Sequence, residues 1–131
     1  MEEGLIREGV MHALTQQRIP YVLAGSIRDD GPLPEVVTDA LTAQDAMRAL
    51  THRATTVIAV ATQLHSIAAG NLIPGYHVLA EGQVRPVYFY VVDMSEFAAA
   101  KLTNRGSLAA RPILTNAQDF LVILERGLNR G

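Results

Sequence analysis

Short apolar runs alternate with helical segments along this chain, and the alternation restricts the fold more than any other feature. Four runs have the composition of strands: 21–24, 55–62, 87–92 and 110–115. Five segments show helical periodicity or strong helix formers: 2–18, 43–53, 67–73, 96–104 and 117–129. Strands that alternate with helices are typically joined by right-handed crossovers into a parallel sheet with helices on both faces. The sequence therefore predicts an α/β fold, a three-layer Rossmann-like domain with a doubly wound parallel sheet.

Local signals refine the predicted strands. The first run ends at Gly25 and is short and apolar enough for a fully buried strand. The apolar, β-branched centre of the second run predicts burial on both faces. Pro112 favours a sheet edge for the last run. Residues 75–85 show no clear pattern.

Other signals mark helix ends. Pro20 ends the first helix, and Thr42 with Asp45 resembles a capping box for the second. Ser95 and Asn116 stand where two later helices need an N-cap. We therefore expect helices to begin directly after the strand ends.

Composition excludes several classes of function. The 131 residues suit one nucleotide-binding domain with its own hydrophobic core. Eleven Lys and Arg against thirteen Asp and Glu give a formal charge of -2, which argues against a nucleic-acid or anionic-membrane surface. The absence of Cys excludes disulfides and thiolate chemistry within this chain. No apolar run reaches the roughly 18 residues of a membrane span, and the acidic start does not fit a signal peptide. We expect a soluble, cytoplasmic protein.

Polar residues follow three of the predicted strands at their carboxyl ends. After the first strand come Gly25, Ser26, Arg28, Asp29 and Asp30; after the second, Thr62, His65 and Ser66; after the third, Asp93, Met94 and Ser95. The carboxyl ends of parallel strands lie at one edge of a sheet, where open α/β folds bind ligands. We therefore expect these residues to form one crevice.

Each group suits part of a dinucleotide. Gly25 lets a phosphate approach the backbone, and Ser26 can donate a hydrogen bond to it. A helix N-terminus after Thr62 offers N–H donors to a pyrophosphate, and Arg28 can pair with an anion. Asp93 can accept both ribose hydroxyls, and its charge disfavours the 2′-phosphate of NADP. These features predict a nucleotide-binding domain with NAD as the cofactor.

Plainer roles stay open for the same residues. Asp93 would also serve as a helix cap, and His65 as a cap or packing residue. Asp29 and Asp30 are common turn residues. No Gly-x-Gly-x-x-Gly fingerprint is present. Three other histidines lack metal-ligand spacing, so no metal site is predicted: His12, His52 and His77.

The chain also resembles a known family. The resemblance is carried by these stretches: 4–10, 23–34, 43–48, 61–72 and 105–107. They resemble the C-terminal nucleotide-binding domain of archaeal-type ornithine cyclodeaminases, a family also described as a conserved domain of bifunctional lysine-oxoglutarate reductase/saccharopine dehydrogenase. That domain is similar in fold to deoxyhypusine synthase, whose NAD site lacks the usual glycine fingerprint. Residues 76–86 fit the family pattern poorly.

The resemblance implies NAD-dependent conversion of ornithine to proline and ammonia. The cofactor takes a hydride from the α-carbon, the δ-amine attacks the resulting imine, and the hydride returns to the cyclic imine. Together with the strand ends, it gives these cofactor-binding candidates: Gly25, Ser26, Ile27, Arg28, Thr62, Leu64, His65, Gly70, Asn71, Asp93 and Met94. Asp30 and His65 are the catalytic candidates, and Arg28 is a further candidate for substrate handling.

The expected partners follow from the same resemblance. Family members usually carry a longer region before this domain, so a missing N-terminal domain or separate chain is considered beside an amino-acid substrate. Such folds commonly dimerise, and we expect a homo-oligomer. Two alternatives to the cofactor domain of an enzyme stay open. One is a stand-alone dinucleotide-binding or regulatory module without catalysis, and the other is a structural fragment that works only with another chain.

Overall fold

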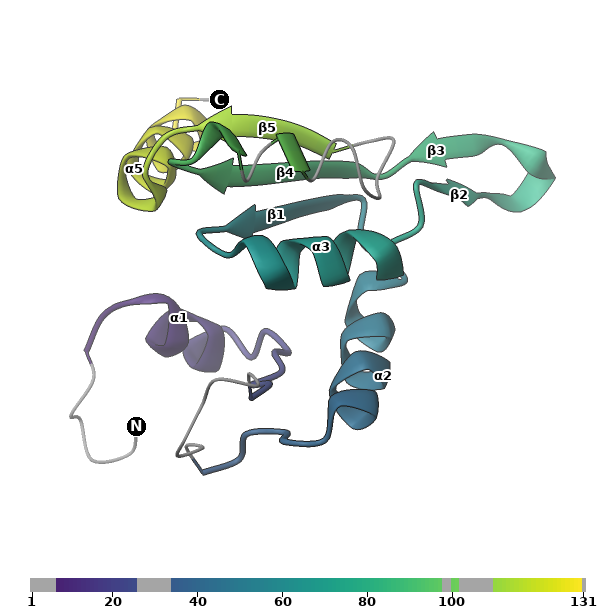
Figure 1. Cartoon of the computed structure of the whole chain (residues 1–131), viewed down its shortest axis with the longest axis horizontal. Coiled ribbons are helices and arrows are strands. Elements are labelled where there is room, and N and C mark those ends of the chain that lie inside the picture. The colour runs from purple at the N-terminus through teal and green to yellow at the C-terminus, as the bar shows by residue number, and fades with distance from the viewer. Residues whose placement is uncertain (1–6, 26–33, 98–99, 102–109, 131) are drawn as a thin grey trace. The chain divides into compact units, whose positions relative to one another are not determined.

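The computed structural model describes residues 7–25, 34–97, 100–101 and 110–130. The chain divides into two compact units, residues 1–50 and 51–131. The first unit contains helix α1 (Val10–Gln16) and nearly all of α2 (Ala40–Thr51). The second contains β1 (Thr56–Val60), α3 (Gln63–Leu72), β2 (Tyr76–Val78), the 3-10 turn η1 (Ala80–Gly82), β3 (Val84–Pro86), β4 (Tyr88–Asp93), β5 (Ala110–Leu114) and α5 (Ala117–Leu128) (Figure 1).

A parallel sheet forms the centre of the second unit. Its strand order is β1-β4-β5, with β4 between the other two strands (Figure 1). Val60 pairs with Val92, and Asp93 pairs with Leu114. All three strands therefore end at the same edge, as the Rossmann-like prediction requires.

β4 supplies the core of the described structure. Its neighbouring side chains point to opposite faces, so Phe89 and Val91 lie on one face and Val92 on the other, and all three are buried. Helix α3 packs on the Phe89 face, where a Cβ added to Gly70 would lie 3.1 Å from Cε1 of Phe89. Glycine fits there because an alanine Cβ would make an unusually close contact that the Phe89 ring would have to shift to accommodate.

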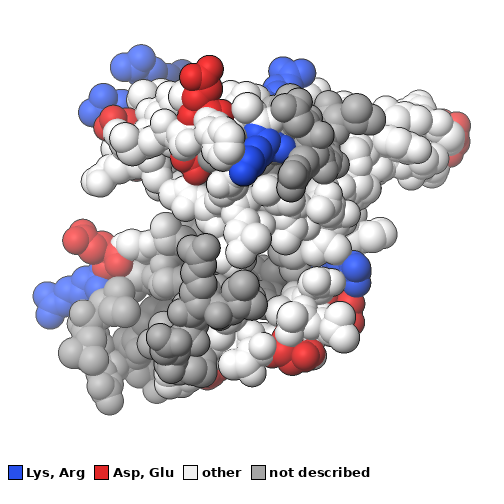
Figure 2. Space-filling view, viewed as in Figure 1, with Lys and Arg blue, Asp and Glu red and all other residues white. Residues whose placement is uncertain are grey.

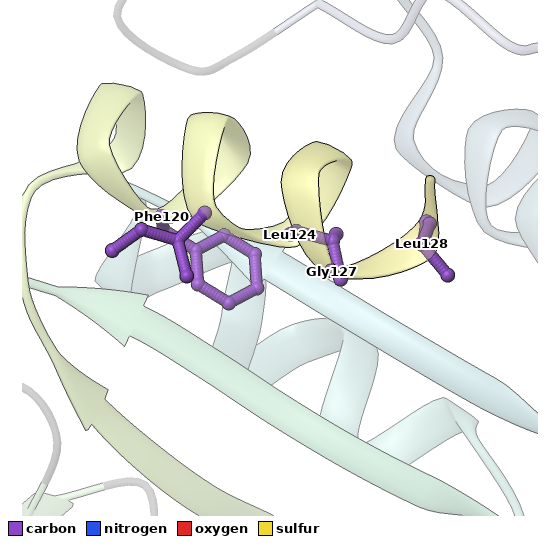
Figure 3. Close-up of a pocket in the computed structure, with 5 residues that line it drawn as sticks. Phe120, Leu124, Gly127 and Leu128 are labelled. Carbon is purple, nitrogen blue, oxygen red and sulfur yellow. The ribbon is translucent and has the colours of Figure 1, made fainter. Parts of the chain in front are cut away.

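Helix α5 lies over the strands on the other side of the sheet. Asn116 caps it, accepting the Asp119 N–H at 2.8 Å, as the sequence predicted. In Figure 3 the helix crosses the strands with the Phe120 ring directed toward them. With α3 on the first face, this arrangement gives the three layers that the sequence predicted.

Two strand predictions were wrong. Residues 21–24 form no strand; Ala24 makes one isolated parallel bridge with Val37, and Tyr21 and Ala24 are exposed. β1 is not buried on both faces, because it is an edge of the described sheet and Ile58 keeps 40% of its surface exposed. Position within a sheet depends on long-range pairing, which β-propensity does not encode. The edge position of β5 is confirmed.

Two local features differ from the sequence pattern. The N-cap of α2 is Asp39, whose Oδ1 accepts the Thr42 N–H at 2.8 Å, so the predicted Thr42–Asp45 capping box was wrong. Asp45 pairs instead with Arg48 at 3.0 Å. Residues 76–86 form an antiparallel hairpin, in which β2 pairs with β3. No described helix is long and apolar enough to cross a membrane.

Candidate functional site

The carboxyl edge of the sheet brings two predicted groups of residues together. Beyond β1, the Ala61 N–H donates to Val92 O at 2.9 Å, which places the turn into α3 beside the end of β4. Beyond β4, the Thr115 N–H donates to Asp93 O at 3.2 Å. The turn before α3 and the turn after Asp93 therefore leave neighbouring strands at one edge, as predicted.

Among the described residues, no side chain caps the N-terminus of α3 at this edge. The helix begins four residues earlier than predicted, immediately after Thr62, and the Thr62 side chain makes no cap hydrogen bond. Its Oγ1 instead lies 2.8 Å from Nδ1 of His65. The first N–H groups of a helix have no intrahelical acceptor, and the helix dipole adds partial positive charge. The arrangement therefore suits an anionic group.

Two residues shape the backbone at the start of α3: Ser66 through a hydrogen bond and Ala61 through its conformation. Ser66 is buried, and its hydroxyl donates to the carbonyl oxygen of Thr62. Ala61 has a φ of 54°, a left-handed conformation that is rare for a residue with a Cβ. Such strain costs about 1 kcal/mol or more and is concentrated at functional sites. The turn into α3 is therefore held in an uncommon backbone conformation, which Arg18, Glu35 and Glu81 also adopt elsewhere in the chain.

Asp93 ends β4 at the same edge and is partly exposed. Its Oδ1 accepts the Ser95 N–H at 2.8 Å, so the capping role left open by the sequence is part of the structure. Oδ2 makes no hydrogen bond to another residue that the structure describes. One carboxylate oxygen therefore holds the turn, and the other can accept from a ligand.

Leu64 and Met94 add apolar surface to the edge. Leu64 lies in the first turn of α3 and is 54% exposed, and Met94 follows Asp93 and is 75% exposed. Single exposed apolar side chains are common on protein surfaces, so exposure alone does not mark a ligand site. Both candidates lie at the predicted edge, and their contact with a ring of the cofactor stays a prediction.

Gly70 and Asn71 lie near the other end of α3. At about 1.5 Å per residue, Gly70 is roughly 12 Å along the helix from Thr62. Gly70 packs against Phe89, and Asn71 is exposed. The structure gives Gly70 a packing role, and cofactor binding by either residue stays a prediction.

The first-strand loop belongs to the other unit. The Gly25 N–H donates to Val37 O at 2.9 Å, and an added Cβ would make only ordinary contacts, the nearest at 3.5 Å from Val36. The fold of this unit therefore does not itself require a glycine at this position. The other predicted residues of this loop lie outside the described residues: Ser26, Ile27, Arg28, Asp29 and Asp30.

Sequence reasoning missed one part of the edge. Thr115 follows β5 and lies beside the end of β4, through its N–H bond to Asp93 O. It is partly buried, and the Asn116 cap begins α5 directly after it. The signal was available, because Thr115 is the last residue of a predicted strand, as Thr62 is.

The described residues form no metal site, and on the face in Figure 2 they form no extended patch of one charge. No group of three His, Asp or Glu suited to a metal occurs within the described residues. His77 binds Ala54 O through Nε2 at 2.8 Å, so it acts as a packing residue. On the face in Figure 2, acidic and basic side chains are interspersed. Ligand recognition at the sheet edge would therefore rest on local groups.

A parallel sheet with helices on both faces, whose strands lead into helices at their carboxyl edge, defines a Rossmann-type α/β domain. Comparison with known proteins gives the family. A family model described as "Arginine dihydrolase ArgZ-like, C-terminal, Rossmann fold" matches residues 1–124. The chain belongs to this family, which confirms the fold and the resemblance predicted from the sequence.

Relatives of known activity match nearly the whole chain. An ornithine cyclodeaminase of Methanococcus maripaludis is 42% identical over 130 residues, which are 99% of this chain and 29% of that protein. A bifunctional arginine dihydrolase/ornithine cyclodeaminase, AgrE of Nostoc, is 35% identical over 99% of this chain and 17% of its own. The chain thus spans less than a third of the length of these relatives.

Solved structures agree with this assignment. A conserved putative LOR/SDH protein from Methanococcus maripaludis has a TM-score of 0.85 at 41% identity, covering 98% of this chain and 35% of that one. AgrE in a ternary complex with ornithine and NAD+ has a TM-score of 0.81 at 36% identity, covering 98% of this chain and 18% of that one.

Proposed function

We propose that residues 1–131 are the NAD-binding domain of an ornithine cyclodeaminase. The observation that carries the proposal is the meeting of two turns, 61–65 and 93–95, at one edge of a parallel sheet. It is supported by 42% identity to an ornithine cyclodeaminase and by 36% identity to a chain solved with ornithine and NAD+.

The described residues fit the parts of NAD. The uncapped first turn of α3 would hold the pyrophosphate through backbone N–H groups. The free Oδ2 of Asp93 would accept ribose hydroxyls, and Oδ1 would keep its bond to the Ser95 N–H. Leu64 and Met94 would pack against a ring of the cofactor.

The chemistry divides between cofactor and protein. NAD, when bound, accepts a hydride from a carbon bearing an amine and can return it to an imine. His65 would exchange a proton through Nε2, because Nδ1 is engaged with the Thr62 hydroxyl. Arg28 and Asp30 stay predicted contacts to the amino-acid substrate. The substrate and the reaction are part of the proposal, since the chain spans 29% of the relative.

Calorimetric titration with NAD+ tests the proposal through two variants of Asp93. Asp93→Ala should weaken binding by about 1–3 kcal/mol, because a charge-assisted hydrogen bond is lost. Asp93→Asn should keep the turn, because the amide oxygen of the asparagine can still accept the Ser95 N–H. Asp93→Asn should nevertheless bind NAD+ more weakly than the parent, because the charge is lost.

The Asn variant separates the two roles of Asp93. If Asp93 only caps the turn, Asp93→Asn will bind NAD+ like the parent, and the ribose contact is refuted. A folded parent chain that shows no binding of NAD+ or NADH would contradict the proposal as a whole.

A second candidate function is a dinucleotide-binding module without turnover. The observation that favours it is that the described groups at the sheet edge, the first turn of α3 and Oδ2 of Asp93, suit a dinucleotide and need no second substrate. It predicts NAD+ binding with no conversion of ornithine. Proline formed from ornithine and NAD+ by this chain alone would exclude it.

A further inference from the structure

Thr62 directs its hydroxyl away from the helix that it precedes. A threonine at this position normally accepts a backbone N–H of the first turn through its side-chain oxygen. The backbone of Thr62 is extended, with φ -148° and ψ 107°, as an N-cap residue requires, yet its side chain makes no cap bond to the described helix. Its Oγ1 lies 2.8 Å from Nδ1 of His65, three residues on. The hydroxyl therefore binds the imidazole instead of the helix backbone.

Neighbouring hydrogen bonds hold Thr62 in place. Its carbonyl oxygen accepts the Ser66 N–H at 3.2 Å and also the hydroxyl of Ser66, which is buried. On the other side, the Ala61 N–H donates to Val92 O at 2.9 Å and attaches the turn to β4. All of these groups belong to the second unit, residues 51–131. The contact between Thr62 and His65 is thus built on a backbone that is held on both sides.

The direction of this hydrogen bond follows from the groups around the hydroxyl. The first N–H groups of a helix are donors, and the Thr62 carbonyl is already engaged by Ser66. Among the described residues, Nδ1 of His65 is the acceptor within reach of the hydroxyl proton. A hydroxyl that accepted from Nδ1 would leave its own proton without an acceptor in this turn. With the hydroxyl donating to Nδ1, the neutral imidazole carries its proton on Nε2.

We propose that Thr62 is a positioning residue that holds His65 in the tautomer with the proton on Nε2. His65 then adds an N–H donor to the backbone donors of the first turn of α3, which suits an anionic oxygen. This inference rests on the proposed function for the identity of that oxygen, which belongs to the pyrophosphate of NAD. It also sharpens the role of Nε2: the first interaction of this atom with a ligand oxygen is the donation of a hydrogen bond.

Nitrogen NMR of the imidazoles measures the tautomer directly and needs no ligand. The sample is 15N-labelled protein of residues 1–131 at about pH 8.5, above the range in which histidines normally titrate. Nδ1 of His65 should have a pyridine-like chemical shift and Nε2 a pyrrole-like shift, and His65→Gln assigns these signals by removing them. His77 is the reference in the same spectrum, because its Nε2 must carry a proton to bind Ala54 O at 2.8 Å.

Two substitutions of Thr62 separate its hydroxyl from its shape. Thr62→Val keeps the branched side chain without the hydroxyl, so the two 15N shifts of His65 should move toward each other as the second tautomer becomes populated. Thr62→Ser restores the hydroxyl and should keep the parent shifts. The His77 shifts should be the same in both variants. Asn116→Ala is the stability control: it removes the cap of α5 and should destabilise the fold without moving the His65 signals.

Calorimetric titration with NAD+ tests the link to the ligand. Thr62→Val should raise the dissociation constant about threefold to tenfold, because the Nε2 donor of His65 is then neither fixed in orientation nor always present. Thr62→Ser should bind NAD+ as the parent does. The rescue by serine distinguishes the loss of the hydroxyl from a general disturbance of the turn.

Three results would overturn the inference. A pyrrole-like shift at Nδ1 of His65 in the parent would show that the imidazole donates to Thr62. Shifts of His65 that are unchanged in Thr62→Val would show that the hydroxyl does not select the tautomer. Equal affinity of Thr62→Val and the parent for NAD+ would show that the Nε2 donor does not contact the cofactor. A parent that binds no NAD+ contradicts the proposed function, and the NMR shifts still decide the tautomer.

Discussion

Helices α3 and α5 both begin at the carboxyl edge of the same sheet, but only one of their N-termini is closed by the chain. Asn116 accepts the Asp119 N–H at 2.8 Å and satisfies the start of α5. Thr62, at the same position before α3, turns its hydroxyl to His65 and leaves the first turn uncapped. A helix start without a cap is destabilised unless something else binds there. The difference therefore predicts that an anionic ligand binds at the start of α3 rather than at the start of α5.

The packing of α3 on the sheet fixes the position of its N-terminus. Among the proposed substitutions, Gly70→Ala is expected to change the free energy of unfolding most. The new methyl group would lie 3.1 Å from the buried Phe89 ring, so overpacking of about 1–3 kcal/mol should exceed the gain in helix propensity. Chemical denaturation measures the change, and Gly75→Ala, in open space, is the control. If Gly70→Ala is as stable as the parent, the close packing of α3 is not required.

Removal of each cap residue tests the comparison itself. Asn116→Ala should cost about 1 kcal/mol of the free energy of unfolding, because the Asp119 N–H loses its acceptor. Asn116→Asp should retain most of that stability. Thr62→Ala should cost only a few tenths of a kcal/mol, because no cap bond is lost. Equal losses at both sites, measured by urea unfolding, would show that the two helix starts do not differ.

Helix α2 has a second capped N-terminus, at Asp39. Protonation of this cap residue is expected to have the smallest effect on stability. Hydrogen bonds from the Thr42 hydroxyl and backbone N–H lower the pKa of Asp39 below its ordinary value of 3.8. Its contribution is therefore fully present above pH 3.8 and is lost as the pH falls through the lower, folded-state pKa. Circular dichroism at 222 nm should show this loss in the parent and not in Asp39→Asn. An advantage of the parent over Asp39→Asn that persists unchanged well below pH 3.8, or that is lost as the pH rises, would have the wrong sign.

The layers and the site edge were predictable because their causes are local. Tyr88 to Val92 are aromatic or β-branched, Asp93 follows them, and the Asn116 cap stands directly after a strand. The residues after parallel strands must then meet at one edge. The positions of Thr62, His65 and Asp93 at that edge therefore followed from the order of the elements.

What the sequence did not reveal depends on distant partners or on an unusual backbone. Residues 21–24 have strand composition, but only Ala24 has a bridge partner in the structure. The hairpin of β2 and β3 closes with Glu81 at a φ of 75°, without the Asn-Gly or Asp-Gly pair that marks such turns. The uncapped state of α3 also escaped prediction, since Thr62 is a good N-cap residue by type.

An NMR titration of the backbone amides with NAD+ tests the central claim most directly. We predict that the amide resonances of residues 63–65 and 94–95 change chemical shift progressively as NAD+ is added to saturation. The resonance of the capped Asp119 amide should not change. Shifts confined to the start of α5, or a spectrum unchanged by NAD+, would contradict the claim that the open start of α3 holds the cofactor.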